Sequence, residues 1–245
     1  MECARLTRYG LLSVKGDDAR EFLHAQLTND IANLPPSRAA LAGWCSAKGR
    51  LLASFLVIPA GDGFLLQLAR DLSAGVAKRL SMFILRSKVN IADESEAWAQ
   101  FGMWGEGVAG EPFAVSRNGK ISVSVAPRRA LVLFPASSAL PATSASETDW
   151  TLQEIRAGRA LITSATQDLF LPQMVNFDEL GAVDFRKGCY PGQEIVARAR
   201  YRGQVKRRLV RLPAPPGSDL RPGQELNGGI VVDAALGEAL AVMPV

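Results

Sequence analysis

One cysteine stands in a stretch rich in glycine and charge, Lys-Gly-Cys-Tyr-Pro-Gly-Gln-Glu at residues 187–194. The thiolate is the reactive form of cysteine, and a nearby lysine or arginine lowers a thiol pKa. Arg186 and Lys187 bring such charge to Cys189, and the glycines of the stretch let backbone come close to a ligand. Cys189 is therefore a candidate functional thiol, with Lys187 beside it as a candidate catalytic group. The alternative is that Cys189 is a small buried residue before a turn.

The same stretch opens a strongly basic segment. Residues 186–211 hold nine Lys or Arg and one acid, a charge of +8, whereas the other residues hold 19 basic and 23 acidic side chains. A charge concentrated in one block indicates an anionic ligand or partner. Arg198, Arg200 and Arg202 alternate with Ala and Tyr, which predicts a strand with three guanidinium groups on one face. Such a row can hold carboxylates or phosphates, or it can be a solvated edge strand.

Several classes of site and location are disfavoured by what the chain contains. His24 is the only histidine, and the three cysteines at positions 3, 45 and 189 are too far apart for a disulfide framework or a two-cysteine metal motif. We therefore expect no metal site. No apolar run approaches the ~20 residues of a membrane helix, and residues 1–10 carry no hydrophobic signal core. We expect a cytoplasmic protein without a membrane segment.

The elements that must position these residues are short helices and hairpins. A helical spacing of apolar residues begins near Asp18, continues through Leu23, Leu27 and Ile31, and stops before the prolines at 35 and 36. Turn signals at Gly61-Asp62-Gly63 and Asn118-Gly119 predict two hairpins. The remaining predicted elements are helices at 71–84 and 149–157 and a strand at 130–134.

A boundary is predicted at residues 136–148, which are almost all Ala, Ser, Thr and Pro. The predicted order is an N-terminal α+β region over 1–135, a linker or long loop over 136–148, a second α+β segment over 149–194, and a small C-terminal β-barrel over 195–245. The mixture of hairpins and helices favours an α+β fold over a doubly wound sheet.

Several segments together resemble the folate-binding YgfZ family, a relative of the glycine-cleavage aminomethyltransferase (T-protein). The resemblance covers nearly the whole chain, and the octet at 187–194 is its most specific part. The matching segments are Gly16–Asp30, Lys48–Arg50, Pro172–Phe177, Val183–Glu194 and Arg202–Leu209.

The resemblance implies an aminomethyltransferase-like α+β fold, with three subdomains in a ring around a funnel that binds tetrahydrofolate. It also implies a role in iron–sulfur cluster assembly or maintenance, with iron–sulfur client proteins as partners and an indirect link to the enzymes that modify tRNA. Two aromatic positions that line the family's folate pocket fall on Tyr9 and Trp150, and the key cysteine falls on Cys189. The arginines at 198, 200 and 202 could attract the glutamate tail of folate. Cys189 alone cannot hold a cluster, which normally takes four ligands.

One departure from the transferases bears on whether this chain is an enzyme. They carry an acidic pair, one member of which is catalytic, where this chain has Ala53 and Ser54. Loss of that carboxylate favours a folate-binding accessory protein over an aminomethyltransferase. Two alternatives stay open: a folate-dependent one-carbon transferase that uses Cys189, and an RNA-binding module that uses the basic segment. An RNA footprint would spread over an exposed face, whereas a folate site would draw the arginines into an enclosed pocket.

Overall fold

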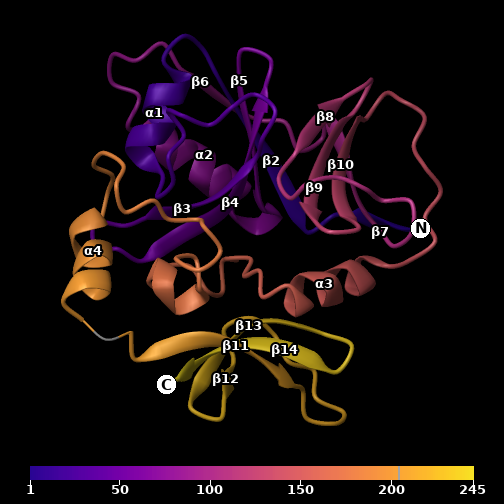
Figure 1. Ribbon diagram of the computed structural model, residues 1–245, viewed down its shortest axis with the longest axis vertical. Coiled ribbons are helices and arrows are strands. Elements are labelled where there is room, and N and C mark those ends of the chain that lie inside the picture. The colour runs from indigo at the N-terminus through magenta and orange to yellow at the C-terminus, as the bar shows by residue number, and fades with distance from the viewer. Residues whose placement is uncertain (204) are drawn as a thin grey trace. The chain divides into compact units, whose positions relative to one another are not determined.

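The computed structural model describes residues 1–203 and 205–245. Gln204, which belongs to one of the segments that carry the family resemblance, lies outside the described residues. The chain forms two compact units that alternate along the sequence (Figure 1). Unit 1 comprises Met1–Phe22, Ala32–Ala40 and Leu56–Trp150, and unit 2 comprises Leu23–Ile31, Leu41–Phe55 and Thr151–Val245.

Unit 1 contains a five-stranded antiparallel sheet in the order β1-β7-β10-β9-β8. The predicted turn at Asn118-Gly119 joins its last two strands, and Gly119 takes the positive φ of 66° that such a turn requires. Cys3 and Phe101 belong to the apolar cluster on this sheet. The strands are β1 (Glu2–Leu6), β7 (Trp98–Trp104), β8 (Val115–Arg117), β9 (Ile121–Ala126) and β10 (Arg129–Pro135).

A second sheet has the order β3-β4-β5-β2-β6, and its strand β4 (Leu51–Ala60) crosses from unit 2 into unit 1. In unit 1, β4 pairs antiparallel with β5 through the predicted hairpin at 61–63. The short helix η1 and helix α2 follow, and they bury Leu72, Val76 and Leu80 as their spacing predicts, but α2 ends at Ser81 instead of residue 84 and Phe83 is exposed. The other elements are β2 (Tyr9–Lys15), β3 (Ala40–Cys45), β5 (Gly63–Ala69), η1 (Arg70–Leu72), α2 (Ser73–Ser81) and β6 (Asn90–Asp93).

Helix α1 (Ala19–Gln26) also crosses the boundary between the units, and it is shorter than its apolar spacing predicts. Leu23, Leu27 and Ile31 are all fully buried, but the helix ends before Thr28. The Thr28 amide donates to Gly43 O at 2.9 Å, and its hydroxyl donates to Ala182 O at 2.7 Å. These hydrogen bonds offer the backbone a partner outside the helix, which is why the helical pattern stops.

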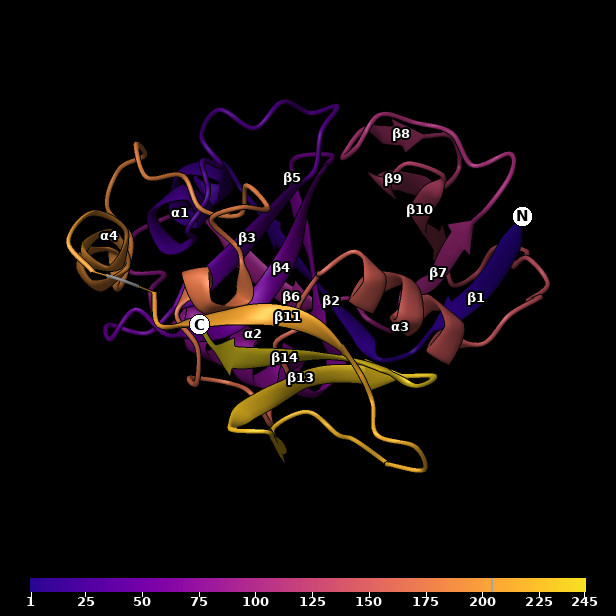
Figure 2. The ribbon, with the colours of Figure 1, turned by 60° about the horizontal axis from the view of Figure 1, so that its bottom comes forward.

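The C-terminal part of unit 2 is a four-stranded antiparallel sheet in the order β11-β14-β13-β12 (Figure 2). It is preceded along the chain by helix α3 (Glu147–Arg156), the short helix η2 (Pro172–Val175) and helix α4 (Gln193–Tyr201). Among the described residues, no helix is both long and apolar enough to span a membrane. The strands are β11 (Arg207–Pro213), β12 (Glu225–Leu226), β13 (Gly229–Ala235) and β14 (Glu238–Pro244).

The predicted strand from Ile195 is wrong, because residues 193–201 form helix α4. Alternation of Arg with Ala has the period of a strand, but both residues are strong helix formers. Positions two apart on a helix differ by about 200° in direction. Arg198, Arg200 and Arg202 therefore do not share one face, and the C-terminal sheet begins at Arg207 instead of Ile195.

Candidate functional site

The octet at 187–194 packs backbone to backbone against the turn that contains Lys48-Gly49-Arg50. Gly192 has a φ of +79°, and a Cβ atom on it would lie 2.3 Å from Ser46 O and 2.6 Å from Gly49 Cα. Gly49 has a φ of +71°, and a Cβ there would lie 2.9 Å from Ile195 Cβ. Two motifs far apart in the sequence therefore meet in unit 2, and glycine is required on both sides of the contact.

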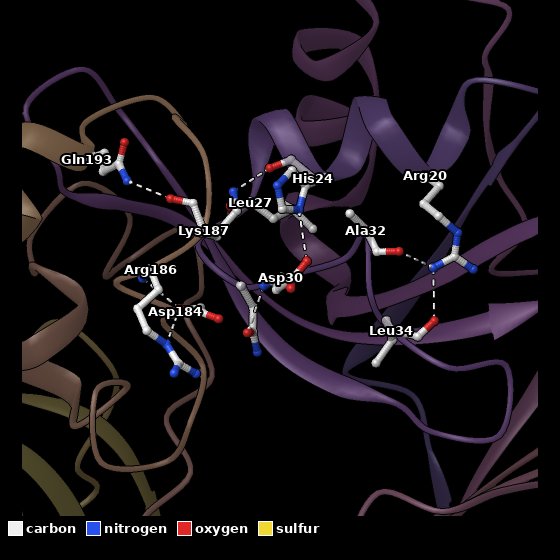
Figure 3. A network of polar contacts seen from close by, with 11 residues as sticks. Arg20, His24, Leu27, Asp30, Ala32, Leu34, Asp184, Arg186, Lys187 and Gln193 are labelled. Atoms are coloured by element: carbon white, nitrogen blue, oxygen red, sulfur yellow. Dashed lines mark hydrogen bonds and ion pairs between the residues drawn. The ribbon is translucent and has the colours of Figure 1, made fainter.

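Lys187 joins the octet to the end of helix α1 (Figure 3). Its side chain is buried, and its Nζ donates to His24 O and, at 2.8 Å, to Leu27 O. A cation is favoured at these carbonyls because they lie at the negative end of the helix. Burial lowers the pKa of Lys187 to about 8, whereas Asp30, Asp184 and Cys189 act in the opposite direction. The geometry gives Lys187 a positioning role, and its predicted catalytic role is still a prediction.

His24 and Asp30 lie beside the octet, and no local sequence pattern predicts this. His24 Nδ1 is 3.2 Å from Asp30 Oδ1, and His24 Nε2 would be 3.7 Å from a Cβ on Gly188. Figure 3 shows the His24 ring above Asp30, with the Lys187 side chain beside it. The only histidine of the chain is thus placed next to the residue that precedes Cys189.

The three cysteines differ in exposure. Cys189 is exposed, whereas Cys3 and Cys45 are buried. Burial raises the pKa of Cys45 to about 12. Within the described part of the chain, no three His, Cys, Asp or Glu side chains are grouped so that they could hold a metal ion.

The arginines of the basic segment point into different surroundings. Arg198 is exposed and pairs with Glu194 at 3.3 Å, one helical turn away. The Arg200 guanidinium lies 4.3 Å from the centre of the Phe185 ring. Arg202 is exposed at the end of α4. These arginines do not form the single row on a strand that was expected to hold the folate tail. Any contribution of the individual arginines to folate binding is still a prediction.

Tyr9 and Trp150 both belong to unit 1, on different elements. Tyr9 opens β2 and is buried, and its carbonyl accepts from Gln100 Nε2 at 3.0 Å. Gln100 in turn accepts from Gln67 Nε2 at 2.8 Å, so two buried amides adjoin Tyr9. Trp150 in α3 is only 2% exposed. Its indole ring is covered by its own unit, through Gly102, Trp104 and Arg129.

Comparison with known proteins decides the family. No protein-family model matches the chain. The chain is 30% identical over 244 residues to the tRNA-modifying protein YgfZ of Pectobacterium carotovorum. The aligned region covers 91% of this chain and 73% of that protein. The chain belongs to the YgfZ family. The YgfZ of Edwardsiella ictaluri is 31% identical over 227 residues, covering 84% of this chain and 69% of that protein, and an uncharacterized protein of Haemophilus influenzae is 30% identical over 229 residues, covering 91% and 77%.

The fold of the chain is that of an aminomethyltransferase, as the family resemblance predicts. The glycine cleavage system aminomethyltransferase T of Bartonella henselae superposes with a TM-score of 0.67 over 99% of this chain and 78% of that protein, at 14% identity. At the positions expected for the transferase acids, Ala53 is fully buried and Ser54 Oγ accepts from Ile162 N at 2.9 Å. The Ser54 hydroxyl therefore accepts a hydrogen bond from the backbone, and neither residue supplies a carboxylate.

We expect Cys189 to be alkylated at least 100-fold faster than Cys45 near neutral pH. Only the thiolate reacts, and a buried thiol with a pKa of about 12 has almost none at that pH. Iodoacetamide labelling followed by mass spectrometry of the cysteine peptides measures both rates in one sample. Equal rates in the folded protein would contradict the burial of Cys45.

We expect Lys187 to make the wild-type protein more stable as the pH rises from about 8 to 10. Its folded pKa of about 8 is below the ordinary value of 10.5. In this range the unfolded lysine therefore binds a proton that the folded lysine has released, and the free energy of unfolding rises with pH.

The variant Lys187→Met should lose this rise and be less stable by about 1–3 kcal/mol, because the carbonyls of His24 and Leu27 lose their donor. The control Lys15→Met should keep the rise, since its hydrogen bond and ion pair with Glu94 raise the pKa of Lys15. Urea unfolding at several pH values measures the difference. The same pH profile in wild type and Lys187→Met would refute the assignment.

Proposed function

We propose that this chain is a tetrahydrofolate-binding accessory protein that supports the assembly or repair of iron–sulfur clusters. Through its client proteins it would support the iron–sulfur enzymes that modify tRNA. The observation that carries the proposal is an exposed thiol on a rigid support, within an aminomethyltransferase fold that lacks the expected carboxylate. The tRNA part is supported by the names of the relatives, which call them tRNA-modifying proteins.

The chemistry of unit 1 suits folate. A pterin is flat, and its edge carries both hydrogen-bond donors and acceptors. Tyr9 offers an aromatic ring, and the amides of Gln67 and Gln100 beside it offer donors and acceptors. Tetrahydrofolate bound there would supply the one-carbon or redox chemistry of its pterin, and these side chains would orient it.

Cys189 would act on a cluster that is cargo. Clusters normally take four protein ligands, so one exposed thiolate would contribute a single ligand while a client protein supplies the others. The contact of Gly192 with the 46–49 turn and the bonds of Lys187 to α1 would keep this thiol in one place.

A second candidate is a folate-dependent one-carbon transferase. The observation that favours it is the His24–Asp30 pair next to Gly188, because a histidine oriented by a carboxylate can take the proton of a thiol nucleophile. A His24→Gln variant separates the two candidates. It should lose function if His24 is the base, and keep it if Cys189 serves only as a ligand.

The test of the proposed function is the variant Cys189→Ser. It should fold and bind tetrahydrofolate like the wild type in calorimetry, since the substitution is nearly isosteric. It should nevertheless fail to restore iron–sulfur enzyme activity in cells that lack the protein. The control Cys3→Ala, which removes a buried cysteine of unit 1, should restore that activity. Full rescue by a folded, folate-binding Cys189→Ser variant would sink the proposal for the thiol.

A further inference from the structure

A basic pocket of about 690 Å³ lies in unit 2, lined by residues of η2, α4 and β11 and of the segments beside them. This size is within the range that holds a small organic ligand or a nucleotide. Its lining includes three cationic side chains, those of Arg200, Lys206 and Arg208, together with the ring of Tyr201. Figure 1 shows α4 leading toward the start of β11.

The floor of this pocket is fixed by hydrogen bonds. Gln173 is 1% exposed, its Nε2 donates to Val196 O at 2.6 Å, and its carbonyl accepts from Arg208 at 2.9 Å. Arg208 also makes a two-pronged pair with Asp178, at 2.7 and 3.0 Å. Gln173 thus ties α4 to β11, and Asp178 neutralises the cation at the floor.

The rim of the pocket keeps its charge. Among the described residues, the Lys206 ammonium and the Arg200 guanidinium have no acidic partner, and both side chains are exposed. The Arg200 guanidinium lies over the Phe185 ring, and a guanidinium held by a ring can still donate its N–H groups to a ligand. Arg202 is exposed close by at the end of the helix.

An aromatic side chain stands among these cations. Tyr201 is 67% exposed, which is unusual for so large a ring, and it lies 6.2 Å from Phe185 and 5.9 Å from the Arg200 guanidinium. A flat exposed ring beside unpaired cations is the arrangement that binds single-stranded nucleic acid: bases stack on the ring and phosphates meet the cations. An acidic protein segment would use the cations but would have no use for the ring.

We infer that this pocket and its rim bind single-stranded RNA, with a base stacked on Tyr201 and phosphates held by Arg200 and Lys206. The choice of RNA over DNA rests on the proposed role in tRNA modification, and the choice of a single-stranded nucleic acid rests on the pocket alone. None of the groups of this site belongs to the thiol chemistry, and Arg200 is the one group that is also predicted to attract the glutamate tail of folate, so RNA binding is measured without folate.

The test is the binding of a fluorescein-labelled single-stranded oligouridylate of about 12 nucleotides, a length suited to one such groove. Fluorescence anisotropy with the full chain, free of folate, measures affinity at about 50 and 200 mM salt. We expect Arg200→Glu/Lys206→Glu to weaken binding at least tenfold and to flatten the dependence of log affinity on log salt by about two units. The control Lys78→Glu/Arg86→Glu makes the same charge change at exposed positions of unit 1 and should bind nearly as the wild type does.

The ring is tested by a second pair of variants. Tyr201→Ala should weaken binding about five- to tenfold, whereas Tyr201→Phe should not, because a base stacks on the ring and not on the hydroxyl. Equal binding by the two charge-reversal variants would overturn the site. If a poly-glutamate peptide displaces the RNA and Tyr201→Ala has no effect, the pocket is a site for an acidic protein segment and the RNA assignment is wrong. Equal or tighter binding of the matching DNA would also overturn the RNA assignment. The folate titration and the cell rescue are separate readouts, so failure here leaves the proposed function untouched.

Discussion

Replacing Gly192 with Ala is expected to lower the free energy of unfolding by about 2–4 kcal/mol, from a strained φ and an overpacked contact together. Its φ of +79° is one that an L-residue adopts only with strain. The new methyl group would also lie 2.3 Å from Ser46 O and 2.6 Å from Gly49 Cα. Both are backbone atoms, so no side-chain rotation can relieve the clash.

The control is Gly158→Ala, at the end of α3. Gly158 has a similar φ of +65°, but a Cβ there would meet nothing within 4 Å. It should cost only the conformational part, about 1 kcal/mol. Urea unfolding of both variants separates backbone strain from the clash. Equal losses would show that the octet and the 46–49 turn are not in backbone contact, and the rigid support proposed for Cys189 would then be lost.

The parts of the fold that could be predicted are those that depend on neighbours in sequence. The hairpins at 61–63 and 118–119 follow from glycines at turn positions, and the buried face of α2 follows from its helical period. Strand β4 is apolar on both faces and buried almost throughout. Its sequence therefore predicts a buried strand, but it does not predict which strands lie beside it in the sheet.

The errors come from signals that are equally compatible with two structures, or from contacts over long separations. Alternating Arg and Ala has the period of a strand. The structure instead has a helix that begins after Gly192, which has a positive φ, and that buries Val196. The apolar spacing of α1 continues to Ile31, but the bonds of Thr28 to Gly43 and Ala182 end the helix earlier. The partner carbonyl in that second bond is 154 residues away, and no local pattern reports it.

The candidate site shows the same division. Cys189 and its glycines were identifiable because the octet is contiguous. The position of His24 beside Gly188 and the bonds of Lys187 to α1 were not, since more than 150 residues separate the partners. The sequence places Lys187 two residues from Cys189, which suggests a catalytic role for its amine. In the structure that amine donates its hydrogen bonds to carbonyls at the end of α1.

Trp150→Ala is expected to cost about 3–5 kcal/mol of stability, the largest effect of any single substitution considered for this chain. Trp150 is 2% exposed, and its ring lies so close to β7 that a Cβ on Gly102 would be 2.2 Å from Trp150 Cε3. The Arg129 guanidinium is 4.9 Å from the ring centre, and the ring of Trp104 is 5.8 Å away. Removing the ring would leave a cavity that these neighbours cannot fill.

The control Trp98→Ala removes a half-buried indole from β7, the strand that Trp150 contacts, together with its hydrogen bond to Glu94. It should cost about 1–2 kcal/mol. Thermal or urea unfolding measures both losses. A loss below that of Trp98→Ala would contradict the burial of Trp150.

This burial also changes how the predicted folate contact of Trp150 must be tested. A loss of stability of about 3–5 kcal/mol in Trp150→Ala would itself weaken folate binding, so weaker binding by that variant would prove nothing about contact. Trp150→Phe keeps an aromatic ring in the same place and should stay folded at a smaller cost. If Trp150 lines the folate pocket, calorimetry should then show tetrahydrofolate binding weakened by about 1–2 kcal/mol, with the unfolding transition still cooperative. Unchanged affinity in folded Trp150→Phe, alongside weakened affinity in Tyr9→Ala, would assign the pocket wall to Tyr9 and leave Trp150 as a core residue.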